Sequence, residues 1–322
     1  MGKKKADKKA KTEAPKTEAK VEESAQPKVG FIGVGLMGHG MAKNILEKGY
    51  PLTILGHKNR KPVTDLVKRG AVEAKSPKAL AEACDVVFLC VTGTPQVEDL
   101  VQRADGLKAG AHKGLIIVDC STSIPQSTLA LAAELKPLGV RFIDVPLGRT
   151  PRDAEAGKLN AMVGCDKKTL KEIRPILEAW AENIIHVGGV GDGHKIKLIN
   201  NFVAMGYASL YAEALTTAAK SGLKLESLAS VLSAGPLACG IMENIIKKGV
   251  LGGDPEAHMF TLKNCLKDIS YYAQFAAATP SSAVVGNAVQ QAYVIANSRG
   301  HGREYMPQLC HAVAKLNDTK LG

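Results

Sequence analysis

Six residues near the start of the chain have the composition and spacing of a phosphate-binding turn. The hexapeptide GVGLMG runs from Gly33 to Gly38 and follows a short apolar run that is typical of a strand. Gly33 permits a tight turn, Gly35 allows the backbone to approach a pyrophosphate, and Gly38 allows a helix to pack on the strand. A helix that begins here offers free N–H groups to phosphate oxygens, so we expect Gly33, Gly35, Leu36, Met37 and Gly38 to bind a dinucleotide. A merely structural glycine turn is the alternative.

The residues after the second apolar run indicate which dinucleotide is bound. NAD sites usually place Asp or Glu at the end of that strand, where the carboxylate holds the ribose 2′-OH. Here Gly56 stands at that place, and the basic stretch HKNRK follows it. A carboxylate would repel a 2′-phosphate, so its absence beside several cations favours NADP, with NAD as the second choice. We expect His57, Asn59 and Arg60 to make the contacts; an ordinary basic loop is the alternative.

The elements that must position these residues follow from the apolar pattern. From Lys28 to about Val187, short apolar runs alternate with amphipathic stretches, which predicts a parallel sheet flanked by helices. The expected strands are 29–33, 52–55, 85–91 and 115–120, extended by the runs RFIDVP and LNAMVG. After Gly193 the pattern is helical, and one long helix is expected from Ile196 until Gly222 closes it.

Composition limits the classes of protein to consider. The chain has 322 residues, of which 45% are hydrophobic, so it can bury one large core or two ordinary ones. Its seven cysteines are odd in number and never spaced CxxC, which argues against a disulfide framework and a zinc site, and we expect no bound metal. No stretch of 18 apolar residues predicts a membrane span.

The charge of the chain has two parts. The formal net charge is +11, of which residues 1–27 carry +3 and the remaining 295 residues carry +8. The Lys-rich segment 1–27 has no aromatic and almost no large aliphatic residue, so we expect a disordered tail. It has neither the apolar core of a secretory signal nor the arginines of a mitochondrial presequence, so a cytoplasmic protein is expected.

Four segments together resemble one enzyme family. They are FIGVGLMGHGMAKNIL at the glycine turn, DCST at 119–122, DVPLGRTPRDAEAGKL at 144–159 and GVGDGHKIKLINN at 189–201. In order and spacing they resemble the β-hydroxyacid dehydrogenase family, which includes 3-hydroxyisobutyrate dehydrogenase and tartronate semialdehyde reductase, over residues 28–322. The resemblance implies a Rossmann domain with a mostly parallel, doubly wound α/β sheet at 28–190. A long helix would join it to an all-α C-terminal domain at 191–322, with the active site between the two.

The resemblance also implies that Lys197 is the catalytic acid/base. Hydride transfer at an alcohol carbon requires a proton to leave or join the oxygen, and a Lys amine does this if its pKa is shifted toward neutrality. Asn201 lies four residues later, on the same face of the long helix, where both side chains meet one small substrate. Asn200 adds a contact from the flank. Lys195 and His194 lack this frame and are expected to be exposed.

The remaining site residues are carried over from the same family. Ser121 matches a serine that contacts the substrate, and its neighbour Thr122 lies near the nicotinamide. Val91 and Thr92 match the stretch that runs along the cofactor, and Lys267 matches a lysine that reaches the nicotinamide end from the helical domain. A turn-capping role for Ser121 and an exposed position for Lys267 are the alternatives.

The substrate loop departs from the family pattern. Most relatives read DxPVSGG here, whereas this chain reads Asp144-Val-Pro-Leu and then Gly148-Arg149-Thr150. An Arg fork with a Thr hydroxyl supplies stronger donors to a bulky, weakly basic anion. This version resembles the 3-sulfolactaldehyde reductase branch, which implies a sulfonate substrate; a carboxylate substrate, or a salt bridge that merely fixes the loop at Arg149, remains open. That branch tends to carry the NAD-type aspartate that Gly56 replaces here.

The sequence therefore predicts an NADP-dependent oxidoreductase that interconverts a small anionic β-hydroxy acid or hydroxysulfonate and its aldehyde. Carboxylate-specific dehydrogenases of the 3-hydroxyisobutyrate or tartronate semialdehyde type are the first alternative. Imine-reducing relatives usually replace the lysine that is present here as Lys197. A protein that binds nucleic acid or an acidic partner through its Lys-rich tail is disfavoured, because tail binding alone would be weak and salt-sensitive. The resemblance implies a homodimer or homotetramer built through the helical domain.

Overall fold

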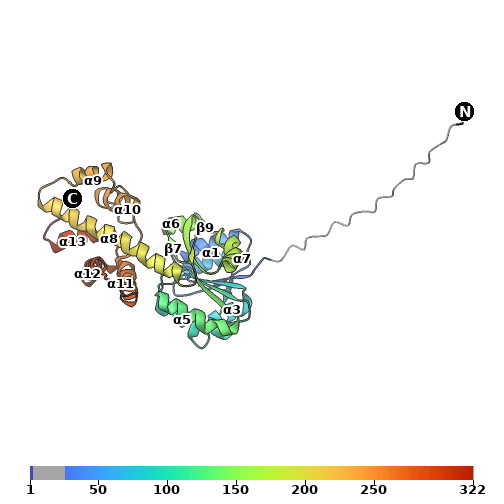
Figure 1. The fold of residues 1–322 in the computed structure, drawn as a ribbon. Helices are drawn as coiled ribbons and strands as arrows, with labels where there is room; N and C mark the ends of the chain where they lie inside the picture. The colour runs from blue at the N-terminus through green and yellow to red at the C-terminus, as the bar shows by residue number, and fades with distance from the viewer. Residues whose placement is uncertain (3–25, 322) are drawn as a thin grey trace.

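The N-terminal half forms a nine-stranded sheet with helices on both faces (Figure 1). The computed structural model describes residues 1–2 and 26–321; the tail expected at residues 1–27 lies mostly outside them. The strands are β1 Val29–Ile32, β2 Leu52–Leu55, β3 Val72–Ala74, β4 Val86–Leu89, β5 Ile116–Asp119, β6 Arg141–Asp144, β7 Leu147–Gly148, β8 Leu159–Gly164 and β9 Ala181–Gly188. The helices between them are α1 Gly38–Glu47, α2 Arg60–Lys68, α3 Pro77–Ala83, α4 Thr94–Gln102, α5 Pro125–Leu135, α6 Pro151–Glu155 and α7 Lys167–Leu177.

The sheet order brings the ends of distant strands to one edge. The order is β3-β2-β1-β4-β5-β6-β8-β7, with β9 paired to β8, and the first six strands run parallel. Ile32 is paired with Leu55 on one side and Leu89 on the other, and Leu89 is paired with Asp119. Chain order reverses at β1, so the turn after β1 lies where ligands of open α/β sheets bind.

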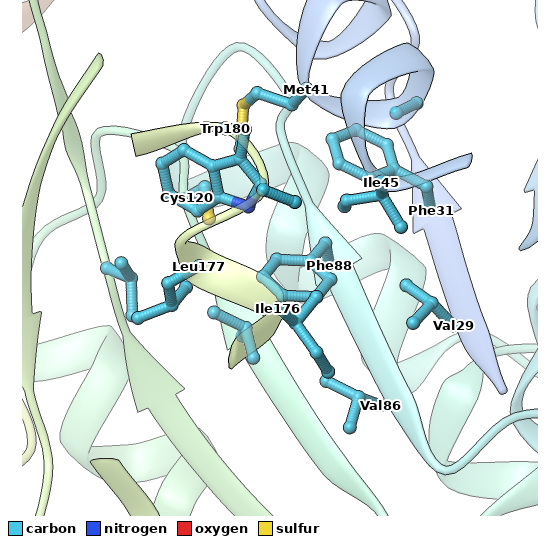
Figure 2. Packing of buried hydrophobic residues seen from close by; sticks show 14 of the residues in the cluster. Val29, Phe31, Met41, Ile45, Val86, Phe88, Cys120, Ile176, Leu177 and Trp180 are labelled. Atoms are coloured by element: carbon cyan, nitrogen blue, oxygen red, sulfur yellow. The ribbon is translucent and has the colours of Figure 1, made fainter. Parts of the chain in front are cut away.

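Each face of the sheet is covered by its own apolar cluster. One cluster contains Phe31, Phe88 and Trp180; the two Phe rings stack 6.0 Å apart, and the indole meets Phe88 edge-on at 6.3 Å (Figure 2). The opposite face is covered by a cluster that includes Val87 and Leu89, which alternate with Phe88 along β4. Unbroken apolar strands are therefore needed because both faces are buried.

A 29-residue helix carries the chain out of the sheet into a helical group (Figure 1). This helix, α8, spans Asp192–Lys220, and Gly222 has a left-handed φ of +78° just beyond its end. Its later turns bury Met205, Tyr211 and Leu215 against the helical group. The other members are α9 Leu225–Ala234, α10 Gly240–Met242, the π-helical turns Glu243–Leu251, α11 Leu262–Ala278, α12 Val284–Ser298 and α13 Gln308–Leu316.

The fold class predicted from the sequence is confirmed, and several details are new. The structure adds the edge strands β3 and β7 and the long β9, none of which was predicted as a separate strand. All seven cysteines are free. Among the described residues, no helix is long and apolar enough to cross a membrane, and no group of three His, Cys, Asp or Glu side chains is placed to hold a metal ion.

Candidate active site

The glycine turn has the geometry that the hexapeptide predicts. Gly33 has φ +99°, and a Cβ there would clash with the Cys90 carbonyl; at Gly38 it would clash with the Gly33 carbonyl. At Gly35 no described atom lies within 4 Å of an ideal Cβ, so the backbone faces open space. Helix α1 begins without a side-chain cap; in its first turn the His39 N–H donates to the Gly35 carbonyl at 2.9 Å. An anion at this uncapped end would face the positive end of the helix dipole.

A cleft of about 470 Å³ opens beside this turn. Gly35, Leu36 and Asn59 line one side, α6 lines another, and Met259 comes from the helical group. Leu36 is 61% exposed, so an apolar side chain is available beside the backbone N–H groups. Met37 is partly buried and packs against the core. The cleft therefore joins the glycine turn to the end of β2.

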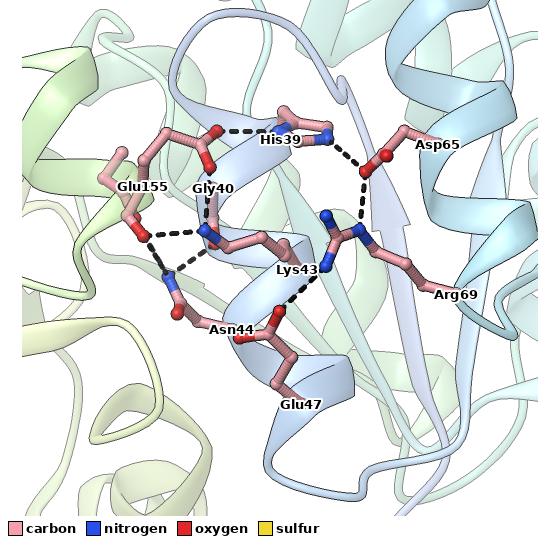
Figure 3. Close-up of polar contacts among 9 residues, drawn as sticks. His39, Gly40, Lys43, Asn44, Glu47, Asp65, Arg69 and Glu155 are labelled. Carbon is pink, nitrogen blue, oxygen red and sulfur yellow. Dashed lines mark hydrogen bonds and ion pairs between the residues drawn. The ribbon is translucent and has the colours of Figure 1, made fainter.

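A network of polar side chains connects α1, the helix that follows the glycine turn, to α2 and α6 (Figure 3). The His39 imidazole lies between Glu155 of α6, 2.6 Å away, and Asp65 of α2, 3.1 Å away. Lys43 donates to the Glu155 carboxylate and to its backbone carbonyl. Hydrogen bonds from Arg69 and then from His39 lower the pKa of Asp65. The network therefore holds α1 against α6, which directly follows residues 148–150 of the predicted substrate loop.

Two of the three residues predicted to select NADP already have protein partners. Asn59 caps α2 by accepting from the Lys61 backbone N–H at 3.2 Å. Arg60 donates to both carboxylate oxygens of Glu73, at 2.8 and 2.7 Å. His57 is exposed. A carboxylate does therefore lie at the end of β2, and β3 supplies it.

Lys197 lies in the second turn of α8 and is partly buried. Burial is the largest effect on its amine and lowers its pKa below 10.5; the charge of Asp268 opposes this shift, and that of Lys267 adds to it. His258 precedes α11. Burial is the largest effect that lowers the pKa of its imidazole, and the charge of Lys197 lowers this pKa further. The Nδ1 atom of His258 is buried and has no described hydrogen-bond partner.

A chain of polar contacts leads from the Lys197 helix to the sheet edge. Asn201 is buried and donates to Asp268 at 2.6 Å, and Asp268 forms an ion pair with Lys267 at 2.8 Å. Lys267 also donates to the backbone carbonyl of Thr92 at 2.5 Å and lies 3.5 Å from that of Thr122. The fold thus brings Asn201, Lys267, Thr92 and Thr122 together. Asn200 is exposed, and its side-chain amide donates to the side-chain oxygen of Asn201 at 3.3 Å.

Ser121 is fixed at the end of β5. It is 3% exposed, and its hydroxyl accepts from the Val91 backbone N–H at 3.0 Å. Its own N–H donates to Asp119, whose other carboxylate oxygen accepts from Ser123. The ends of β4 and β5 therefore hold each other in register where α8 approaches them.

The expectation that His194 is exposed is wrong. Its side chain is fully buried, with Nδ1 2.7 Å from the Thr128 hydroxyl and Nε2 3.2 Å from the Ser121 carbonyl. Its backbone N–H donates to Asp144, which also accepts from Gly191 and so caps the start of α8. Glycine at 193 leaves room for this carboxylate, which a Cβ there would strike. The sequence showed a short polar stretch and gave no sign of this buried partner set.

The substrate loop uses its polar side chains internally. Arg149 has a left-handed φ of +78°, donates to the Lys158 carbonyl at 2.6 Å and pairs with Glu182 at 2.5 Å. Thr150 caps α6 and exchanges hydrogen bonds with Asp153. Gly148 ends β7, where a Cβ would press on Asn160. The salt bridge that fixes the loop, one of the two roles left open for Arg149, is present.

Comparison with known proteins covers both halves of the chain. Residues 28–188 match the family described as the NAD binding domain of 6-phosphogluconate dehydrogenase. Residues 191–312 match the family described as NAD-binding of NADP-dependent 3-hydroxyisobutyrate dehydrogenase. The two matches meet at the start of α8.

Individual relatives are similar over most of their length. The NAD-dependent L-serine dehydrogenase of Pseudomonas aeruginosa is 31% identical over 305 residues, covering 91% of this chain and 99% of that protein. The 3-sulfolactaldehyde reductase of Escherichia coli is 29% identical over 277 residues, covering 86% and 92%. The structure of Mycobacterium tuberculosis 3-hydroxyisobutyrate dehydrogenase with L-serine superposes with a TM-score of 0.79 at 26% identity, covering 89% of this chain and 99% of that one.

Proposed function

The chain belongs to the β-hydroxyacid dehydrogenase family of NAD(P)-dependent oxidoreductases, and we propose that it interconverts a small anionic β-hydroxy acid or hydroxysulfonate and its aldehyde. The observation that carries this proposal is the environment of Lys197. Burial lowers the pKa of its amine, and the polar chain through Asn201 and Lys267 leads to the strand ends beside the glycine turn. These contacts support a role for Lys197 as the acid/base group and for Asn201 as a substrate contact.

The residues at the glycine turn fit a dinucleotide. The open space at Gly35 and the uncapped start of α1 suit a pyrophosphate, as do the adjoining cleft walls. A bound nicotinamide cofactor would supply or take up the hydride at the alcohol carbon. Thr92 and Thr122, whose carbonyls Lys267 joins, would lie beside the nicotinamide.

Lys197 would move the proton that accompanies the hydride. In oxidation its neutral amine accepts the hydroxyl proton, and in reduction its ammonium returns a proton to the aldehyde oxygen. A lowered pKa makes both forms available nearer to neutral pH, which general acid/base catalysis requires. Ser121 and the exposed amide of Asn200 would hold the substrate beside it.

The cofactor is proposed to be NADP, with NAD as the second choice. The exposed imidazole of His57 and the guanidinium of Arg60 flank Asn59 in the sequence, and Asn59 lines the cleft wall. Both terminal nitrogens of the Arg60 guanidinium already donate to Glu73, so Arg60 could bind a 2′-phosphate only while it shares these donors with the carboxylate. The names of the relatives include both cofactors.

The two candidate classes of substrate differ in their anionic group, which is a sulfonate in one and a carboxylate in the other. A sulfonate held by Arg149 and Thr150 requires the arginine to leave or share its partner Glu182. That pairing favours the second candidate, a carboxylate substrate, for which backbone N–H groups of the loop suffice. Replacing Arg149 with Ala distinguishes them, because only a sulfonate substrate should then lose most of its kcat/KM.

The proposed reaction is tested with one variant and a substrate panel. We expect NADPH to bind wild-type protein in a fluorescence titration, and absorbance at the nicotinamide band to report turnover of semialdehydes or a sulfolactaldehyde. Lys197→Ala should lower kcat about 10²- to 10⁴-fold while cofactor affinity stays within about twofold. Turnover that survives this change, or no binding of either cofactor, contradicts the proposal.

A homodimer or homotetramer built through the helical group is part of the proposal. Large apolar side chains are exposed there, including Leu210 at 65%, Val231 at 71% and Val284 at 73%. Light scattering on the purified protein gives the mass directly. A monomer at micromolar concentration contradicts this part alone.

A further inference from the structure

Strand β3 brings a carboxylate to the place where the sequence shows none. Strand β2 ends at Leu55, and Gly56, which has no side chain, follows it. Strand β3 runs parallel to β2, with Glu73 beside Ile54 and Ala74 beside Leu55. Because parallel neighbours point to the same edge, a side chain from β3 can reach over the end of β2.

Glu73 and Arg60 meet directly over Gly56. The guanidinium donates to both carboxylate oxygens, at 2.8 and 2.7 Å, in the fork geometry that pairs these groups most strongly. A Cβ on Gly56 would clash with both the Arg60 and the Glu73 side chains. The pair therefore fills the volume that a side chain at position 56 would occupy, which is the usual place of the acidic residue in NAD sites.

We infer that Glu73 determines the choice between NAD and NADP. This inference rests on the proposed function, since it requires a dinucleotide in the cleft. The Glu73 carboxylate would accept a hydrogen bond from a ribose 2′-OH, which favours NAD. Toward a 2′-phosphate it acts in the opposite sense, because it repels the phosphate and occupies the Arg60 fork.

The charge state of Glu73 is consistent with this role. The hydrogen bonds from Arg60 lower the pKa of Glu73, so the carboxylate is ionised throughout the neutral range. The carboxylate side chain is 33% exposed and the arginine side chain 57%, so neither group is closed off by the protein. The pair lies next to the cleft wall in sequence, because Asn59, which lines the cleft, directly precedes Arg60. NADP is then accepted through Arg60 against the charge of Glu73.

The test replaces Glu73 by its neutral isostere. For wild type and Glu73→Gln, the dissociation constants of NADPH and NADH are measured by fluorescence titration without substrate. The matched control is Glu172→Gln, which removes the carboxylate of a second two-pronged pair, with Arg141 at 2.6 and 2.8 Å on β6. Arg60→Gln is measured as the opposing variant.

The expected result is a shift of preference toward NADPH. In Glu73→Gln the ratio of the NADH to the NADPH dissociation constant should rise about five- to tenfold, because one like charge near the 2′-phosphate is removed. In Arg60→Gln the ratio should fall, and in Glu172→Gln it should stay within about twofold of wild type. Glu73→Ala should shift the ratio in the same direction as Glu73→Gln.

Two outcomes overturn the inference and differ from each other. If wild type binds both cofactors and the ratio is unchanged in both Glu73 variants, Glu73 has no part in the choice, while the proposed function stands. If wild type binds neither cofactor, the proposed function fails and this inference fails with it. Thermal melting of each variant shows whether lost binding reflects lost folding.

Discussion

The buried imidazole of His194 gives the sharpest prediction about how α8, the helix that carries Lys197, is held in place. It lies one turn before Lys197 and contacts Thr128 of α5 and the carbonyl of Ser121. A carbonyl oxygen only accepts, so Nε2 must carry a hydrogen, whereas the Thr128 hydroxyl can donate or accept. Asp119 and Asp144 lie 3.7 and 3.9 Å from the ring nitrogens.

The replacement His194→Ala should be severely destabilising. Two hydrogen bonds of about 1 kcal/mol each are lost, and a buried carbonyl is left unpaired at a further cost of about 1–3 kcal/mol. Before any cost for the cavity that remains, the total is about 3–5 kcal/mol, which corresponds to a melting temperature lower by roughly 6–20 °C. His194→Gln keeps a donor for the Ser121 carbonyl and should recover at least half of this loss.

The assay is thermal melting combined with turnover. Lys195→Gln is the matched control on the same helix, because its ion pair with Asp192 is partly exposed and contributes less than about 1 kcal/mol. We expect kcat to fall in His194→Ala at a temperature where the variant is folded, with cofactor affinity unchanged. A melting temperature within about 2 °C of wild type would refute the reasoning.

Three further predictions test the glycine turn, the polar network around α1 and the proposed acid/base role of Lys197. Gly38→Ala should abolish cofactor binding in a fluorescence titration, because the new Cβ strikes the Gly33 carbonyl. The pKa of Asp65 is lowered by Arg69 and His39, so its stabilising effect is present above its ordinary value of 3.8 and is lost as pH falls through the lower folded value; melting curves should show this loss. For alcohol oxidation, kcat should increase with pH as the Lys197 amine loses its proton. The midpoint of this increase should lie below pH 10.5, because burial lowers the pKa of Lys197, and Lys197→Arg should abolish the increase.

The sequence predicted best where one segment contains the whole signal. The glycine turn, the parallel strands and the long helix are encoded by local spacing, and the structure has each of them. The partners of charged groups come from elsewhere in the chain. Glu73 lies 17 positions after Gly56 on a three-residue strand, and only the pairing of β3 with β2 places its carboxylate at that end. The burial of His194 likewise depends on α5 and β5, which no pattern around residue 194 specifies.

Several of the basic side chains that the sequence singled out form ion pairs within the protein. Arg60 and Arg149 were expected to bind anions and Lys267 to reach the nicotinamide, and each of the three is paired with a carboxylate of the chain itself. Among residues 26–321, Lys197 forms no ion pair within 4 Å, and burial lowers the pKa of its amine. A paired cation binds a second anion only by sharing its donors, so these sites select by geometry more than by net charge. The unpaired amine remains free to exchange a proton, which is the property that an acid/base group needs.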